Sequence, residues 1–107
     1  MFPASQRIHT TKDILHVLRH GARRNQAVVA CSFVKKPGTV SRVAVIVDTK
    51  VSKKATVRNL CKRRVRAILQ ASPLPVGDLV VRLRPGAPEL TFGQLQANLT
   101  ACLRNLA

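Results

Sequence analysis

The sequence predicts an α+β fold, a small two-layer sandwich with the order helix, strands, helix, strand, helix. Three stretches carry apolar residues at helical spacing, and Val-rich runs typical of strands lie between them. Pro and Gly residues that favour turns fall at 37–38, 73–77 and 85–88, between these runs. The chain has 107 residues, which is enough for one domain with its own core. Residues 1–107 are therefore expected to form a single domain.

The first helix is predicted to start near Thr11, whose side chain can cap it, and to end at Gly21. Asp13 falls in the first turn, where the helix dipole favours a negative charge. The apolar side chains at helical spacing are Ile14, Leu15, Val17 and Leu18. We expect them to form the face that packs against the rest of the fold.

Two Val-rich runs after this helix predict strands. Residues 27–34 (AVVACSFV) follow the polar segment GARRNQ, to which no strand is assigned, and they stop at the turn sequence KKPG. Residues 42–48 (RVAVIVD) are almost continuously apolar, which is typical of a central strand that is covered on at least one face. A third strand is predicted at residues 79–84, before the turn sequence PGAP.

A basic amphipathic helix is predicted between the second and third of these strands. The segment KVSKKATVRNLCKRRVR, residues 50–66, contains eight Lys or Arg residues and no acid. At about 100° per residue, the apolar side of the helix consists of Val57, Leu60, Cys61, Val65, Ile68 and Leu69. The opposite side carries Arg58, Asn59, Lys62, Arg63 and Arg66. We expect the apolar side to lie on the sheet and the basic side to face solvent.

A closing helix completes the predicted fold. Its apolar residues recur at helical spacing: Leu95, Leu99, Cys102, Leu103 and Leu106. Thr91 precedes them and is the predicted N-cap.

The charge of the basic helix indicates an anionic partner. The chain has 19 Lys and Arg residues against 4 Asp and Glu, a formal net charge of +15, and a polyanion would relieve the resulting repulsion. Arg58, Lys62 and Arg66 form an i, i+4, i+8 column with no acid between them. Arginine can bind two phosphate oxygens at once, and Asn59 could reach a base edge or a 2′-hydroxyl. Nucleic acid is therefore the predicted partner.

The titratable residues give little support to catalysis by the protein itself. Its four acids lie in four different segments: Asp13, Asp48, Asp78 and Glu89. A metal-dependent nuclease needs several carboxylates around one ion, so no catalytic residue is predicted. His16 and His20 have a spacing that could hold a metal, but no third ligand is evident. We interpret them as solvated surface histidines and predict no metal site.

The cysteines and the overall hydropathy are typical of a cytoplasmic protein. There are three cysteines and no CxxC, so neither a disulfide framework nor a zinc ribbon is predicted. Cys31 and Cys102 fall in apolar patterns and are expected in the core, as is Cys61, although Lys62 and Arg64 could lower its pKa. No apolar run approaches the roughly 20 residues of a membrane helix, and no signal peptide is evident, so no membrane partner is expected.

Residues 49–69, TKVSKKATVRNLCKRRVRAIL, resemble the signature of the bacterial ribonuclease P protein subunit. The resemblance extends to KDILHVLRHG, VAVIVDTK, VGDLVVRLRPGA and the Leu-rich tail. It implies an assisting subunit with no cofactor of its own. It further implies that an RNA subunit, with bound Mg²⁺, removes the 5′ leader of precursor tRNA. The resemblance also implies a mixed sheet in which the basic helix forms a left-handed crossover between parallel strands, contrary to the usual handedness.

The resemblance also implies which residues bind RNA, whereas no DNA partner is expected. Contacts with the catalytic RNA are expected from Lys50, Lys53, Lys54, Arg58, Asn59, Lys62, Arg63 and Arg66. The leader is expected in a cleft between the basic helix and the sheet. Positions that carry aromatic residues in the family, facing this cleft, are occupied here by Ile14, Leu18 and Ala30.

Two departures from the family pattern affect these expectations. Leu60 replaces an expected arginine and is predicted to extend the apolar face of the helix. Without rings at the cleft positions, leader bases cannot stack there, so phosphate attraction should carry more of the affinity. Apart from the resemblance, the residues also fit a structural RNA-binding protein, such as a small ribosomal protein, and a protein-only nuclease is a third alternative.

Overall fold

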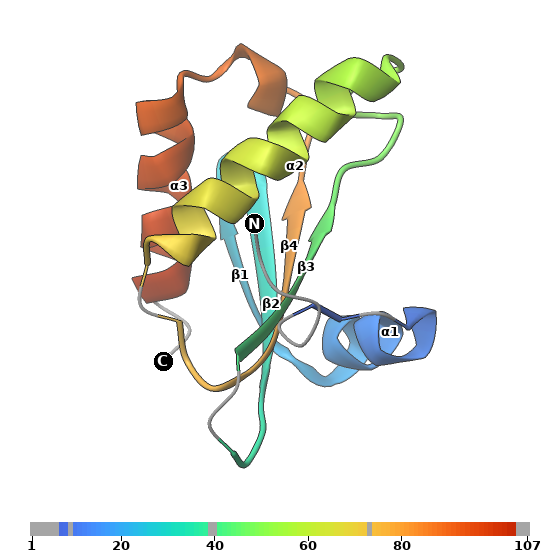
Figure 1. Cartoon of the computed structure of the whole chain (residues 1–107), viewed down its shortest axis with the longest axis vertical. Coiled ribbons are helices and arrows are strands. Elements are labelled where there is room, and N and C mark those ends of the chain that lie inside the picture. The colour runs from blue at the N-terminus through green and yellow to red at the C-terminus, as the bar shows by residue number, and fades with distance from the viewer. Residues whose placement is uncertain (1–6, 9, 39–40, 73, 105–107) are drawn as a thin grey trace.

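The computed structural model describes residues 7–8, 10–38, 41–72 and 74–104 (Figure 1). Along this part of the chain the elements are α1 (Thr11–His20), β1 (Ala22–Gln26), β2 (Val29–Lys35), β3 (Ser41–Ile46), α2 (Ala55–Gln70), β4 (Gly77–Leu83), the short 3-10 helix η2 (Ala87–Glu89) and α3 (Phe92–Arg104). The predicted α+β class and the predicted order of helices and strands are confirmed.

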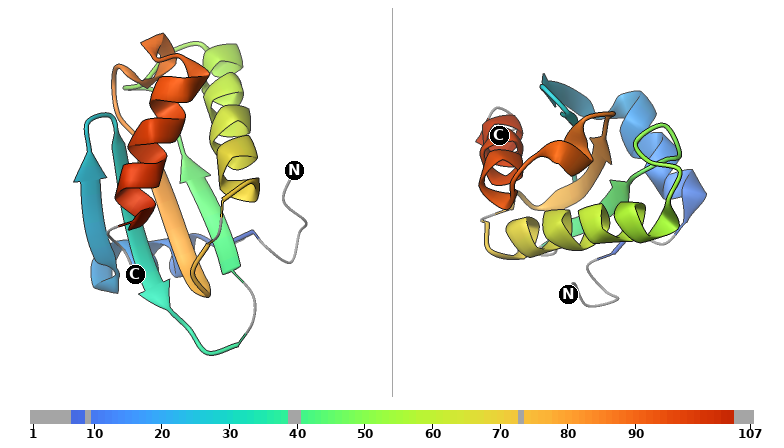
Figure 2. Two further views of the ribbon diagram at one scale, coloured as in Figure 1. Left: turned by 90° about the vertical axis from the view of Figure 1, so that its left-hand side faces the viewer. Right: turned by 90° about the horizontal axis from the view of Figure 1, so that it is seen from above.

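The strands form one mixed sheet in the order β1-β2-β4-β3. β2 pairs antiparallel with both β1 and β4, whereas β3 and β4 are parallel neighbours. The chain leaves β3, runs through α2 on one face of the sheet, and returns as β4. In the left-hand view of Figure 2, α2 lies in front of the sheet and β4 lies to the left of β3, so this crossover is left-handed.

The prediction that residues 42–48 form a central strand is wrong, because β3 is an edge strand of the described sheet. Its apolar run has a different cause. Val43 and Val45 pack with the core beneath α2, whereas Ala44 and Ile46 pack with the cluster beneath α1. Both faces of the strand are covered, and a strand covered on both faces lacks the polar alternation of a half-exposed strand.

Two hydrophobic clusters hold the helices on opposite faces of the sheet. The larger one joins α2 and α3 to the sheet and includes the fully buried Val65, Leu69, Val81 and Leu99. The smaller one joins α1 to the other face through Val17 and Val80. Figure 1 shows α2 and α3 on one side of the sheet and α1 on the other, near the lower end of the strands. Much of the α1 face is therefore left without a helix above it.

The ends of α1 depend on two residues. Thr10, rather than the predicted Thr11, is the N-cap: its backbone is extended, and its Oγ1 accepts a hydrogen bond from the Asp13 amide at 3.2 Å. Thr11 is already the first helical residue and cannot adopt the cap conformation. Gly21 ends the helix as predicted, with an extended backbone, and a side chain would not fit there, because a Cβ would lie 2.8 Å from the carbonyl oxygen of Phe33.

A reciprocal capping box starts α3. Thr91 Oγ1 accepts from the Gln94 amide at 3.1 Å, and Gln94 Oε1 accepts from the Thr91 amide at 2.9 Å. The predicted cap is thus confirmed, and it satisfies two backbone amides at the helix start. Leu95, Leu99 and Cys102 are buried as predicted, whereas Leu106 lies outside the described residues.

Replacing Thr91 by alanine should destabilise the fold by about 1 kcal/mol, the usual effect of losing a threonine cap. For a chain of this size, that corresponds to a decrease in melting temperature of about 4 °C. The matched control is Thr100→Ala, an exposed position within α3, where alanine favours the helix and no loss is expected. Equal melting temperatures for Thr91→Ala and the unaltered protein would show that the capping box contributes nothing.

Candidate nucleic-acid interface

The basic residues of α2 lie along a flank of the helix and on its outer face. Asn59 and Arg63 are exposed, whereas Arg58, Lys62 and Arg66 are half-buried at the boundary between the sheet and solvent. Arg58 Nη1 donates to the Ser52 carbonyl at 2.9 Å, which holds its side chain against the start of the helix. The expectation that the whole column points into solvent is therefore wrong for its first member.

Leu60 also lies differently from its predicted position. Its side chain is 38% exposed, so it does not extend the apolar face. The buried face of α2 is made by Cys61, Val65, Ile68 and Leu69. Leu60 is displaced by about 100° around the helix from Cys61, which takes it past the edge of this face.

The cations of α2 are not neutralised by acids within the described part of the chain. The ion pairs found there join Asp13, Asp48 and Asp78 to Lys36, Arg42 and Arg82, and none involves α2. Lys50, Lys53 and Lys54 precede the helix and are exposed, and the first turn of α2 contains no acid. The positive end of the helix dipole adds to these charges. This end of the molecule therefore presents a cationic surface to an external anion.

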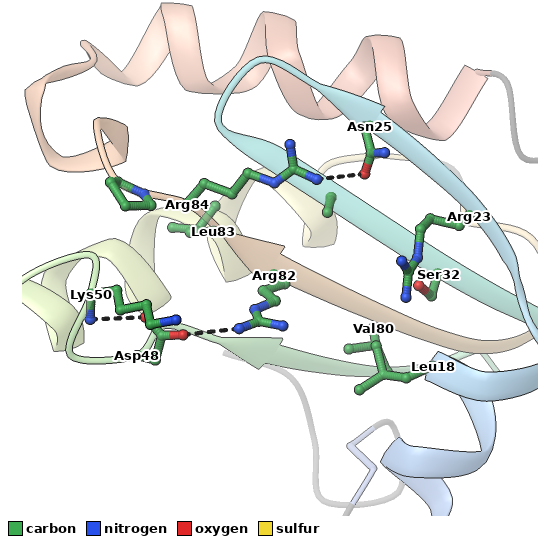
Figure 3. Close-up of a pocket in the computed structure, with 12 residues that line it drawn as sticks. Leu18, Arg23, Asn25, Ser32, Asp48, Lys50, Val80, Arg82, Leu83 and Arg84 are labelled. Atoms are coloured by element: carbon green, nitrogen blue, oxygen red, sulfur yellow. Dashed lines mark hydrogen bonds and ion pairs between the residues drawn. The ribbon is translucent and has the colours of Figure 1, made fainter.

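A hollow lies on the other face of the sheet, beside α1 (Figure 3). Residues from α1, β1, β2, β4 and the turns at the upper end of the sheet line it: Leu18, Arg23, Asn25, Ala30, Ser32, Asp48, Lys50, Val80, Arg82, Leu83, Arg84 and Pro85. Leu18 and Ala30 thus line one hollow, and their role at a leader cleft stays a prediction. Ile14 instead lines a second hollow, together with Arg7 and Arg66.

The hollow that Leu18 and Ala30 line does not lie between the basic helix and the sheet, where the cleft was expected. The space beneath α2 is filled by the larger hydrophobic cluster, including the fully buried Val65 and Leu69. The hollow opens on the opposite face because α1 covers only part of it. Lys50 connects the two regions, since it lines the hollow and belongs to the segment that leads into α2.

Three arginines at the hollow were missed by sequence reasoning: Arg23, Arg82 and Arg84. The signal was present in the strand sequence VVRLRP, where alternate residues point to opposite faces of the sheet. Val80 and Arg82 lie on the hollow side, whereas Leu79 and Val81 enter the core beneath α2. Two arginines at alternate positions near the end of a strand place two guanidinium groups on one face.

Hydrogen bonds hold two of these guanidinium groups above the hollow. Arg82 Nη2 donates to Asp48 Oδ2 at 3.1 Å, and Arg84 Nη2 donates to Asn25 Oδ1 at 2.9 Å (Figure 3). The Asp48 carboxylate also accepts from the Lys50 amide at 3.0 Å. The hydrogen bond from Arg82 is the main cause that lowers the pKa of Asp48 below its usual value. Asp48 is thus ionised at neutral pH and orients Arg82.

A buried carboxylate links β4 to β3 near the start of α1. Asp78, at the start of β4, accepts two hydrogen bonds from Arg42, at 2.8 and 2.7 Å, and pairs with Lys36 at 2.8 Å. Arg42 also lies 3.7 Å from Asp13 in the first turn of α1. The hydrogen bonds from Arg42 are the main cause of a lowered pKa at Asp78, against the opposing effect of burial. This cluster stabilises the end of the sheet on which α1 lies.

The histidines and cysteines of the described residues do not form a metal site or a catalytic site. Among the described residues, no group of three or more His, Cys, Asp or Glu could hold a metal. His16 and His20 are exposed, with ring centroids 4.8 Å apart. The three cysteines are buried as predicted. The suggestion of a lowered pKa at Cys61 is wrong, because burial raises its pKa and outweighs the charge of Arg64.

None of the helices in the described part of the chain is both long enough and apolar enough to cross a bilayer.

Comparison with known proteins decides the family. The family model for ribonuclease P matches residues 2–107. The chain belongs to the bacterial ribonuclease P protein component family. Curated family members include the protein of a Picosynechococcus species, 33% identical over 93 residues (84% of this chain and 80% of the relative), and that of an Azoarcus species, 31% identical over 100 residues (92% and 83%). The Thermus scotoductus member is 41% identical over 68 residues, but the match covers only 41% of its length.

Solved structures of the family share the fold. The RNase P protein from Thermotoga maritima is 28% identical and superposes with a TM-score of 0.84, covering 94% of this chain and 97% of that one. The Staphylococcus aureus RNase P protein is 22% identical, with a TM-score of 0.82 over 92% of this chain and 93% of that one, and it supports the fold alone.

Proposed function

We propose that this chain is the protein subunit of ribonuclease P and assists a catalytic RNA in removing the 5′ leader from precursor tRNA. The observation that carries the proposal is the cationic surface of α2, which no acid of the described chain neutralises, in a member of this family. In this proposal the RNA subunit, with Mg²⁺, performs the hydrolysis. The protein supplies binding and orientation, and it works in the cytoplasm.

Two surfaces serve two RNA segments in this proposal. The first is the α2 surface with the residues that precede it, which binds the catalytic RNA: Lys50, Lys53, Lys54, Asn59, Lys62, Arg63 and Arg66, with Arg58 at its edge. The second is the hollow beside α1, which receives the single-stranded leader. Lys50 belongs to both, so the leader can enter the hollow while the body of the RNA lies against α2.

A protein that holds both RNAs raises the affinity of the catalytic RNA for precursor tRNA more than its affinity for mature tRNA. Contacts to the leader exist only before cleavage, so they favour the substrate over the product. Cations at both surfaces also reduce the repulsion between the two RNAs, which is strongest when little Mg²⁺ is present. The benefit of the protein should therefore be largest at low Mg²⁺ and low salt.

The test is cleavage of a precursor tRNA by a cognate catalytic RNA at low Mg²⁺, with and without the purified protein. We expect the protein to raise the cleavage rate and to tighten binding of precursor tRNA relative to mature tRNA. RNA binding without stimulation would instead favour a structural RNA-binding protein. Cleavage by the protein in the absence of the catalytic RNA would favour a protein nuclease and refute the proposal.

A further inference from the structure

We infer that the hollow binds single-stranded RNA through its phosphates and discriminates little among the bases. This inference rests on the proposed function and adds the mode of recognition at the leader site. It follows from three properties of the hollow, which are the spacing of its cations, the size of the side chains on its floor and the state of its polar groups.

The cations at the hollow are spaced along a strand. Arg82 lies near the end of β4 and Arg84 directly follows the strand, and a separation of two residues corresponds to about 6.6 Å of strand rise, similar to the step between phosphates in an extended single strand. Asp48 orients Arg82, and Asn25 orients Arg84. Arg23 and Lys50 add two more positive charges to the lining. Guanidinium groups held in place lose less conformational entropy when they bind phosphate.

The floor between these cations is small and lacks rings. In the register of the sheet, Ala30 lies between Asn25 of β1 and Arg82 of β4, and Ser32 lies next to Val80. None of the described residues that line the hollow is aromatic. Phe33 is buried in the core on the other side of the sheet, Phe92 belongs to α3, and Phe2 lies outside the described residues.

The acceptor groups of the hollow are already engaged, so they leave little capacity to read the donor groups of base edges. Asn25 Oδ1 already accepts from Arg84, and both carboxylate oxygens of Asp48 accept hydrogen bonds. Ser32 is buried, with 4% exposure. Bases that enter the hollow therefore meet mainly the aliphatic surface of Leu18, Ala30 and Val80. Stacking on a ring, worth about 1–3 kcal/mol per base in other proteins, is absent from this arrangement.

The experiment compares precursor tRNAs with chemically altered leaders, bound by the complete ribonucleoprotein. Abasic substitution at each leader position should change the dissociation constant less than about twofold, below the effect of losing one stacked base. A neutral methylphosphonate linkage at the positions that reach the hollow should weaken binding about fivefold, the effect of one phosphate contact near 0.1 M salt. A loss of more than fivefold on abasic substitution would overturn the inference.

Two variants test whether the effects of altered phosphates and bases in the leader arise at the hollow. With Arg82→Gln/Arg84→Gln, the methylphosphonate linkages should lose most of their effect, whereas an unchanged loss would overturn the inference. With Ala30→Tyr, a ring lies on the floor, and abasic leaders should then bind about fivefold or more weakly than natural ones. If Ala30→Tyr does not fold, the abasic result with the unaltered protein still decides. Equal binding of precursor and mature tRNA with the unaltered protein would refute the leader site itself.

Discussion

Combined replacement of Lys62, Arg63 and Arg66 by glutamine is expected to weaken binding of the catalytic RNA by about 100-fold near 0.1 M salt. Each phosphate contact releases condensed counterions, and the loss of three contacts should lower the slope of log affinity against log salt by about 2–3. The melting temperature should change little, because these side chains lie outside the hydrophobic clusters. Arg58 is left in place, because its hydrogen bond to Ser52 supports the start of α2.

A variant with the same change in net charge separates local contacts from general attraction. Lys12, Arg19 and Lys35 are exposed residues away from α2, and their replacement by glutamine also removes three positive charges. This control should lose only the small, long-range part of the affinity. Filter binding or fluorescence anisotropy over a salt series measures both variants. Equal losses for the two would show that α2 is not the RNA-binding surface.

Asp78→Asn is expected to lower the free energy of unfolding by about 2–3 kcal/mol. Asparagine keeps the shape of the side chain but removes the buried negative charge between Arg42 and Lys36, and only the more exposed Asp13 remains near Arg42. Breaking a fully buried pair typically costs ~3–5 kcal/mol, and the smaller figure is expected here because Arg42 and Lys36 remain 30% and 40% exposed. Thermal unfolding should show a decrease in melting temperature of about 8–12 °C.

The effect of Asp78→Asn should depend on pH in a defined direction. Hydrogen bonds from Arg42, followed by those from Lys36, lower the pKa of Asp78 in the folded state. Its stabilising effect is therefore fully present above the unfolded pKa of about 3.9 and is lost as the pH falls through the lower, folded value. The difference in free energy of unfolding between the variant and the unaltered protein should be constant from about pH 5 to 8, because this range lies above the unfolded pKa of ~3.9. It should shrink at lower pH.

Asp48→Asn is the matched control, since it removes the same charge from an ion pair whose side chains are 33% and 50% exposed. Solvent screens such a pair, so little change in melting temperature is expected. Comparable losses at Asp48 and Asp78 would show that burial of the carboxylate is not what makes Asp78 important.

Elements with strong local signals were predictable from the sequence. In α2, apolar residues at helical spacing and an uninterrupted set of cations predicted both the helix and its contact with the sheet, because each signal lies within about five turns of chain. The cap of α3 was predictable for the same reason, since Thr91 and Gln94 are three residues apart. The RNA-binding role assigned to Arg63 and its neighbours stays a prediction.

β1 was not predictable, because its five residues, ARRNQ, are polar and all exposed. Pairing with β2 stabilises this strand, not burial of its own side chains. The two-residue turn that follows it has Ala27 at a φ of 48°, a conformation for which glycine or asparagine is the usual signal. Neither an apolar pattern nor a turn sequence therefore marked the hairpin.

The hollow was only partly predictable, because its position depends on the order of the strands. Leu18 and Ala30 were expected at a cleft between α2 and the sheet, whereas the hollow that they line opens on the opposite face. The contact between Asn25 and Arg84 joins residues 59 positions apart and exists because β4 lies beside β2, which itself pairs with β1. A local pattern contains no information on such an order.

The sheet order has a consequence for synthesis of the chain on the ribosome. β4 is the last of the described strands to be made, yet it lies between β2 and β3, so β3 cannot join the described sheet until residues 77–83 have emerged. At translation rates of about 5–20 residues per second, the nascent chain spends several seconds in this state, before the residues of β4 and α3 can join the hydrophobic cluster beneath α2. The same positive charge that suits a polyanion also repels other copies of the unfinished chain, and thereby limits aggregation during this interval.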